Sequence, residues 1–206
     1  GGFRDIGAFE LQQACVVDTG SVVKDSLTIV SNSSWMKSTV STPSNYSGSW
    51  SGVGGVLPPD GTFTLSAIEG QPYSFNSIDS IDGATVIKTD NNITYYRKSF
   101  NLDTLQNFEA RFRLFVDDQA EVYINGELVV AQYTGGVENY KLPAFDALFN
   151  NDNTVSNPNS GGDLYDLTTG MNMDNIFKRG VNTVTIAVRN KGKASDLGGF
   201  TFRLDI

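Results

Sequence analysis

The feature that most constrains this chain is a two-residue alternation of apolar and polar side chains, which recurs in its second half. Between residues 108 and 116, apolar side chains take every second position and charged ones fill most of the positions between. Because successive side chains of a strand point to opposite faces, this period indicates a strand with one buried face. The pattern returns at residues 183–189 and 200–205. Several such strands predict an all-β fold, an antiparallel β-sandwich or jelly roll, instead of a parallel sheet.

Two local signals refine this prediction. Residues 93–100 form a further expected strand, in which the adjacent Tyr95 and Tyr96 must point to opposite faces. Asn125 and Gly126 stand between two apolar runs, and both residue types tolerate a positive φ. The pair therefore predicts a tight type I′ hairpin turn.

Two long segments interrupt the strand pattern. Residues 31–61 are rich in Ser and Gly, and residues 141–175 are rich in Asn and Asp. Connections of this length within a compact domain are usually functional or mobile, so both are expected to be loops. Short helical turns are predicted at 143–149, inside the second segment, and at 173–178, across its end, with Gly180 closing the latter.

The absence of histidine removes several kinds of catalytic site. No histidine occurs in the chain, which excludes Ser-His-Asp and Cys-His nucleophiles, His-ligated zinc and histidine as a general base. The single cysteine, Cys15, has no partner for an intramolecular disulfide and is predicted to be a small buried apolar side chain. We therefore expect a chain that is not an enzyme, with no catalytic residues.

Charge and hydropathy limit the partners. The net charge of −8 argues against nucleic acid, which requires clustered Lys and Arg. No apolar run approaches the ~20 residues needed to cross a bilayer. The sequence opens on Gly1 without Met or a signal peptide, so we expect a fragment or mature portion of a longer protein.

Three stretches, taken in order, resemble the galactose-binding-like jelly-roll domains appended to bacterial glycoside hydrolases and surface proteins. They are YYRKSF at 95–100, VDDQAEVYING at 116–126 and GVNTVTIAVRN at 180–190. SSW at 33–35 and GGF at 198–200 also fit the pattern. The resemblance covers roughly residues 16–206 and is more specific for fold than for ligand, because fold alone does not define function.

The first residues look different. DIGAFE at 5–10 resembles the C-terminal end of bacterial right-handed parallel β-helix proteins. We therefore expect residues 1–12 to be an N-terminal segment, the remnant of a preceding β-helix domain, and 13–206 to be the galactose-binding-like β-sandwich. The resemblance implies an extracellular or cell-surface bacterial protein with neighbouring domains on the same polypeptide.

Carboxylates offer two further hypotheses. Asp117 and Asp118 are adjacent, so they point in different directions, and we interpret them as turn chemistry instead of a glycosidase pair. The resemblance implies that a structural Ca²⁺ is common in such domains, and oxygen ligands for it are available around Gly83 and in the second long segment. The metal ligands stay open between two clusters: Asp79, Asp82 and Asp90, or Asn151, Asp152 and Asn153.

Loop aromatics are the better candidates for ligand binding, because sugar rings stack on exposed aromatic faces while amides bind their hydroxyls. Trp50, flanked by serines, is predicted to be exposed. Trp35 matches the family pattern and is predicted to fill the core, with sugar contact as the alternative. The full set of candidate ligand-binding residues is Trp50, Tyr46, Trp35, Tyr133, Tyr140, Asn139 and Asn190.

Three functions from different classes are open, and the third, an enzyme domain that processes glycans, would require a convergent pair of inward carboxylates in a deep cleft. The first is a non-catalytic carbohydrate-binding or adhesive module of a larger secreted bacterial protein, with a glycan or cell-surface polysaccharide as its partner. The second is a structural or interaction module that spaces or docks a neighbouring domain and binds no sugar. Exposure of Trp50 or Tyr46 beside a groove would favour the first, and burial of both would favour the second.

Overall fold

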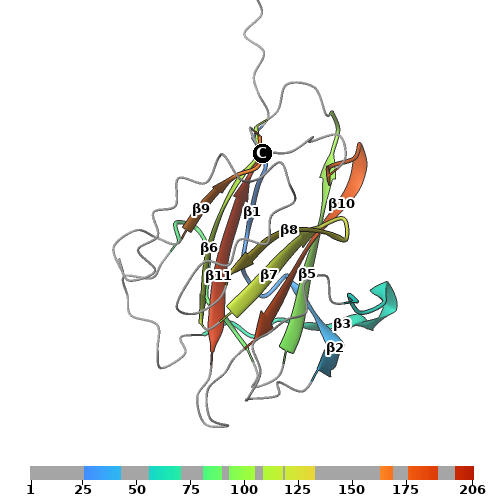
Figure 1. The fold of residues 1–206 in the computed structure, drawn as a ribbon, viewed down its shortest axis with the longest axis vertical. Helices are drawn as coiled ribbons and strands as arrows, with labels where there is room; N and C mark the ends of the chain where they lie inside the picture. The colour runs from blue at the N-terminus through green and yellow to red at the C-terminus, as the bar shows by residue number, and fades with distance from the viewer. Residues whose placement is uncertain are drawn as a thin grey trace, which may run out of the picture.

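The computed structural model describes residues 26–42, 56–70, 81–89, 93–104, 109–117, 119–132, 163–168, 176–189 and 198–206. These residues form two antiparallel β-sheets stacked face to face (Figure 1). The predicted β-sandwich is therefore confirmed. Residues 1–12, expected to be a separate segment, lie outside the described ranges.

The five-stranded sheet brings together both ends of the described chain. Its order is β1 (Thr28–Val30), β11 (Gly199–Asp205), β6 (Arg111–Asp117) and β9 (Asp163–Asp166), and β4 (Ile87–Lys88) also pairs with β11. The long strand β11 thus has β6 along one edge and the short strands β1 and β4 along the other.

The six-stranded sheet places the three motif stretches next to one another. Its order is β3 (Phe63–Ser66), β2 (Met36–Thr42), β5 (Ile93–Leu102), β10 (Gly180–Arg189), β7 (Gln119–Ile124) and β8 (Glu127–Gln132), with a 3₁₀ turn, η1 (Asp60–Thr62), just before β3. The centre of this sheet is β5, β10 and β7, the strands that contain most of the stretches on which the resemblance depends.

The core lies between the sheets and is built from the alternating positions. Phe112 and Leu114 of β6 are buried from one side, and Val122 and Ile186 are buried from the other. Complete burial of such a side chain contributes roughly 1.5–3 kcal/mol. Trp35 closes part of this core, where its ring meets Phe200 and Phe202 edge to face at centroid distances of 5.9 and 5.5 Å.

The two local predictions, the hairpin turn and the opposite orientations of Tyr95 and Tyr96, are also confirmed. Asn125 and Gly126 have φ values of 51° and 89° and turn β7 into β8, as a type I′ hairpin requires. Tyr96 lies in the core between the sheets, whereas Tyr95 belongs to a second cluster on the other face of the same sheet.

The prediction that residues 31–61 and 141–175 are loops throughout is wrong in part. The first segment contains β2, and the second contains β9. The β2 sequence MKSTVST lacks an apolar alternation, so the period gave no signal for it. Its pairing is also irregular, with register shifts between Lys37 and Ser38 and between Lys37 and Ser41. Of the predicted helical turns, 143–149 lies outside the described ranges, and only residue 176 of 173–178 is described as helical.

Candidate functional site

Among the predicted ligand residues, only Trp35 lies in the described ranges. It is 0% exposed and donates from Nε1 to the carbonyl oxygen of Val30 over 2.8 Å. This agrees with the core interpretation of Trp35, and the buried ring offers no face to a sugar. The six others lie outside the described residues: Tyr46, Trp50, Tyr133, Asn139, Tyr140 and Asn190.

Strand register shows where the connections carrying these six residues join the fold. Thr42 and Arg189 both pair with Ile93, Arg189 also pairs with Gln119, and Ala120 pairs with Gln132. One end of the six-stranded sheet, here called the loop end, is thus made by the end of β2, the start of β5, the end of β10, the start of β7 and the end of β8 (Figure 1).

These six residues follow, in the sequence, strands that end at the loop end. Residues 43–55, with Tyr46 and Trp50, follow β2 at Thr42. Tyr133 comes directly after β8, with Asn139 and Tyr140 further along the same connection, and Asn190 comes directly after β10. A sheet end from which several connections emerge is where a rigid scaffold can present binding side chains.

The outer face of the six-stranded sheet, which points away from the core, carries an aromatic cluster that sequence reasoning missed. Tyr95, Tyr123 and Ala187 are buried there, and four further side chains pack against them. These positions alternate with core positions along their strands, so the sequence pattern assigns them to the solvent-exposed face of the sheet. The pattern of one strand does not show whether other residues cover that face. The four packing side chains are those of Leu57, Phe63, Ile93 and Leu128.

Residues 56–63, here called the covering segment, supply part of that second layer. Leu57 and Phe63 pack on the cluster, and Pro58 is buried. Thr62 donates from its amide and from Oγ1 to the carbonyl oxygen of Pro59, at 3.0 and 2.7 Å, which makes the turn compact. The segment leads from the 43–55 connection into the edge strand β3.

A buried carboxylate lies on the same face. Glu121 is 1% exposed, and it accepts a hydrogen bond from the hydroxyl of Tyr123, which is 2% exposed. Register places Glu121 opposite Ala187 and Tyr123 opposite Thr185. Burial of an ionisable group is costly unless it is hydrogen-bonded, so the pair fixes both side chains on the sheet.

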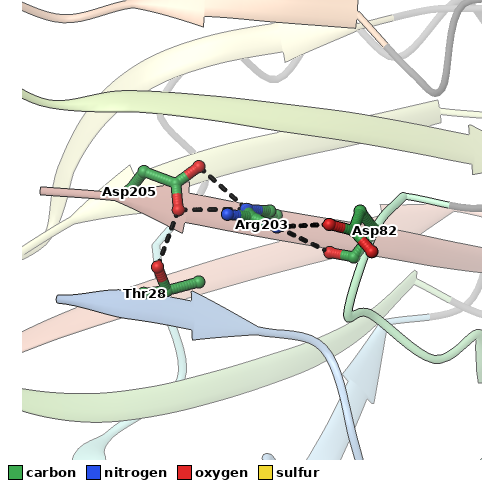
Figure 2. Close-up of polar contacts among 4 residues, drawn as sticks. All are labelled: Thr28, Asp82, Arg203 and Asp205. Carbon is green, nitrogen blue, oxygen red and sulfur yellow. Dashed lines mark hydrogen bonds and ion pairs between the residues drawn. The ribbon is translucent and has the colours of Figure 1, made fainter. Parts of the chain in front are cut away.

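The opposite sheet carries an ionic network centred on Arg203. Its Nε donates to both carboxylate oxygens of Asp205 at 3.0 and 2.9 Å, and its Nη1 donates to the backbone oxygen of Asp82 at 3.0 Å. Figure 2 shows Arg203 between the two aspartates, with Thr28 donating to Asp205 at 2.8 Å. The network connects β1, the turn at Asp82 and β11.

This network sets the ionisation of Asp205. Burial acts to raise the pKa of Asp205, but hydrogen bonds from Arg203 and Thr28 and the charges of Arg203 and Arg113 outweigh it. The pKa of Asp205 is therefore lowered. The pKa of Arg203 is raised, chiefly by its hydrogen bond to Asp205, against the opposing effect of burial.

The described residues provide no cluster of ligands for the predicted Ca²⁺. Asp82 directs its Oδ2 toward Arg203 at 3.4 Å. Asp79 and Asp90 lie outside the described residues, as do Asn151, Asp152 and Asn153. The described part of the chain contains no group of three acidic or cysteine side chains arranged to hold a metal ion.

The adjacent Asp117 and Asp118 are only half described. Asp117 is the last residue of β6 and pairs with Gly199 through the backbone, while Asp118 lies outside the described ranges. In the same described part of the chain, no helix has the length and hydropathy that spanning a membrane would require.

No family model and no curated protein matches this chain. Among solved structures it is similar to an FMN-binding beta-glucuronidase from Facaelibacterium prausnitzii L2-6, at 12% identity and a TM-score of 0.37 over 87% of this chain and 22% of that one. It is also similar to a chain from Bacteroides fragilis assigned as a beta-galactosidase, at 12% identity and a TM-score of 0.40 over 87% and 23%. The chain thus spans less than a quarter of either protein, and likenesses of this strength show neither its family nor its activity.

Proposed function

We propose that this chain is a non-catalytic carbohydrate-binding or adhesive module of a larger secreted bacterial protein. The observation that carries the proposal is the convergence at the loop end. The strands that precede Tyr46, Trp50, Tyr133 and Asn190 all end in one row of the six-stranded sheet. A row of strand ends gives loop side chains a common rigid base, which is what a sugar site needs.

The chemistry of these residues suits a neutral, hydroxyl-rich ligand. Aromatic rings stack on the apolar faces of sugars, and amide side chains such as that of Asn190 both donate to and accept from hydroxyl groups. The net charge of −8 disfavours a polyanionic partner. A glycan or cell-surface polysaccharide outside the bacterial cell is the ligand class we propose.

The motif stretches support the resemblance from which the sugar class is taken. Strand β10 lies between β5 and β7 and pairs with both of them, although it is far from both in the sequence. The three sequence stretches that carry the resemblance therefore lie largely in strands that are neighbours in the sheet. This supports a galactose-binding-like module, and the ligand itself is our proposal.

We propose binding without turnover. Glycoside hydrolysis requires two carboxyl groups that face each other across the scissile bond. In the described residues, the carboxylates of Asp82 and Asp205 both contact Arg203, and that of Glu121 accepts from Tyr123. These partners favour structural roles for the three groups.

A glycan array tests the proposal, run with the wild type and with Trp50→Ala, in the presence and absence of a chelator. We expect binding that falls at least about tenfold in Trp50→Ala, as for loss of a central aromatic contact. Val181→Ser is the matched control, because Val181 is 61% exposed at the start of β10, the end opposite to the loop end. It should bind like the wild type.

The outcomes separate the two function classes. Absence of binding to every glycan would overturn the carbohydrate function and favour a module that docks a neighbouring domain. Binding that survives in Trp50→Ala would contradict the role of Trp50 and move the site to other residues. Loss of binding with the chelator would support a structural Ca²⁺.

A further inference from the structure

We propose that Arg97 is a positioning residue, which fixes the covering segment on the outer face of the six-stranded sheet and thereby sets the affinity of the loop end for its ligand. The part about affinity rests on the proposed function. The anchoring itself is carried by contacts between described residues and can be tested without any ligand.

The Arg97 guanidinium holds the covering segment in two ways. Its Cζ lies 3.9 Å from the centroid of the Phe63 ring, at the distance of a cation–π contact. Its Nη1 also donates to Oδ1 of Asp60, an ion pair in which the aspartate side chain is 95% exposed. One side chain of β5 thus contacts the first residue of the turn, Asp60, and the first residue of β3, Phe63.

The same guanidinium is also hydrogen-bonded to the sheet itself. Its Nε donates to Oγ1 of Thr185 on the neighbouring strand β10 at 2.9 Å, and Thr185 is 1% exposed. The Arg97 side chain itself is 13% exposed. The guanidinium group is planar and its N–H donors have fixed directions. The hydrogen bonds to Thr185 and Asp60, together with the contact over the Phe63 ring, therefore define one orientation of the Arg97 side chain.

A second anchor ties the segment to β2. Ser38, which is 2% exposed, shares a hydrogen bond with the hydroxyl of Thr62 at 2.8 Å. Arg97 and Ser38 therefore hold the covering segment to two neighbouring strands, β5 and β2. With two anchors, loss of Arg97 should loosen the segment without unfolding the sandwich, whose core lies on the other face of the sheet.

The covering segment connects this anchor to the loop end. It begins at Val56, where the connection that leaves β2 at Thr42 returns to the described fold. Its Leu57 packs in the same cluster as Ile93, which pairs with Thr42 at the loop end. A shift of the covering segment therefore moves the point at which the C-terminal end of the 43–55 connection joins the fold.

Amide hydrogen exchange of the free protein tests the anchor first. In Arg97→Gln we expect the amides of residues 60–66 to exchange roughly tenfold faster or more, because local opening becomes easier. Phe63→Leu removes the ring beneath the guanidinium and keeps an aliphatic side chain to pack on the cluster, so it should also speed exchange at the same amides. Arg97→Lys keeps the charge over Phe63 but not the fork, so it should restore protection only partly.

Arg203→Gln is the matched control. Arg203 is also a partly buried arginine paired with an aspartate, but it lies on the five-stranded sheet. Its loss should lower stability without selective exchange in residues 60–66. Unchanged protection of these amides in both Arg97→Gln and Phe63→Leu would overturn the inference.

Glycan affinity provides the second readout. For a residue that does not touch the ligand, we expect Arg97→Gln to weaken binding about 2- to 30-fold, while Arg203→Gln leaves it unchanged. If exchange rises but affinity is unchanged, the anchor stands and the positioning role is overturned. If the wild type binds no glycan while exchange still rises, the carbohydrate function fails and the anchor of the segment is supported.

Discussion

The side-chain amide of Asn125 donates to the side-chain carbonyl of Asn182 over 2.7 Å, and this bond joins the β7–β8 turn to the start of β10. Asn182 also accepts from the amide of Lys178 and donates to the carbonyl oxygens of Lys178 and Gly180. The Oδ1 of Asn125 accepts a hydrogen bond from the backbone amide of Thr183. Two asparagines thus satisfy the backbone groups where three segments meet.

Asn182→Ala should lower the free energy of unfolding by about 2–3 kcal/mol, because Asn182 is fully buried and its loss leaves backbone groups without partners. Urea unfolding measures the change. Asn101→Ala is the control: Asn101 is exposed and its side-chain amide donates to Asp103, so its loss should cost under about 0.5 kcal/mol. Equal effects of the two substitutions would contradict the role of Asn182.

Trp35→Phe should cost about 2 kcal/mol, because it removes indole packing against Phe200 and Phe202 and leaves the carbonyl of Val30 without its donor. Thermal or urea unfolding tests this. A spectroscopic check uses Trp50→Phe, which leaves Trp35 as the only tryptophan. Its emission should be blue-shifted and resist acrylamide quenching, and a strongly quenched Trp35 would be incompatible with its burial.

Stability should decline in acid partly through Asp205. Because the pKa of Asp205 is lowered in the folded state, its contribution is present above the unfolded pKa, about 3.9, and is lost as pH falls through the folded value. The stability difference between wild type and Asp205→Asn should therefore be about 0.5–1 kcal/mol at neutral pH and vanish in strong acid. Unfolding at a series of pH values measures it, and a pH-independent difference would contradict the ion pair.

Gly126→Ala should cost about 1 kcal/mol, because Gly126 has a φ of 89° that a residue with a Cβ adopts only with strain. Within the described part of the chain, no atom beyond Gly126 and its two sequence neighbours lies within 4 Å of the position that a Cβ would take, so the cost is conformational and not steric. Gly61→Ala is a clean control, since that position is equally open and its φ is not positive. A similar loss of stability in both variants would argue against a strained turn.

Much of the fold could be predicted because its core strands obey simple alternation. Phe112, Leu114, Phe202 and Leu204 are buried as the period of two predicts. The hairpin was predictable from Asn125-Gly126, because few residue pairs tolerate two positive φ values. Where a strand has one buried and one solvent-exposed face, the sequence pattern is sufficient to predict both the strand and its buried residues.

The short and doubly covered elements could not be predicted in this way. Strand β2 combines Ser and Thr with interrupted pairing, so it lacks a period. Glu121 and Tyr123 alternate with core residues and therefore resemble solvated positions, although a second layer buries them. The contact between Arg97 and Phe63 joins residues far apart in sequence, and a local pattern carries no signal for it.

The central position of β10 has a consequence for how the chain folds during synthesis. Its neighbours β5 and β7 leave the ribosome first, but they do not pair with each other and must wait for β10 to be inserted between them. Likewise β11 lies between β1 and β6 and pairs with both. Such non-local closure slows folding and exposes strand edges in the interval. We expect acquisition of native structure to occur late and cooperatively, once the final strands are available.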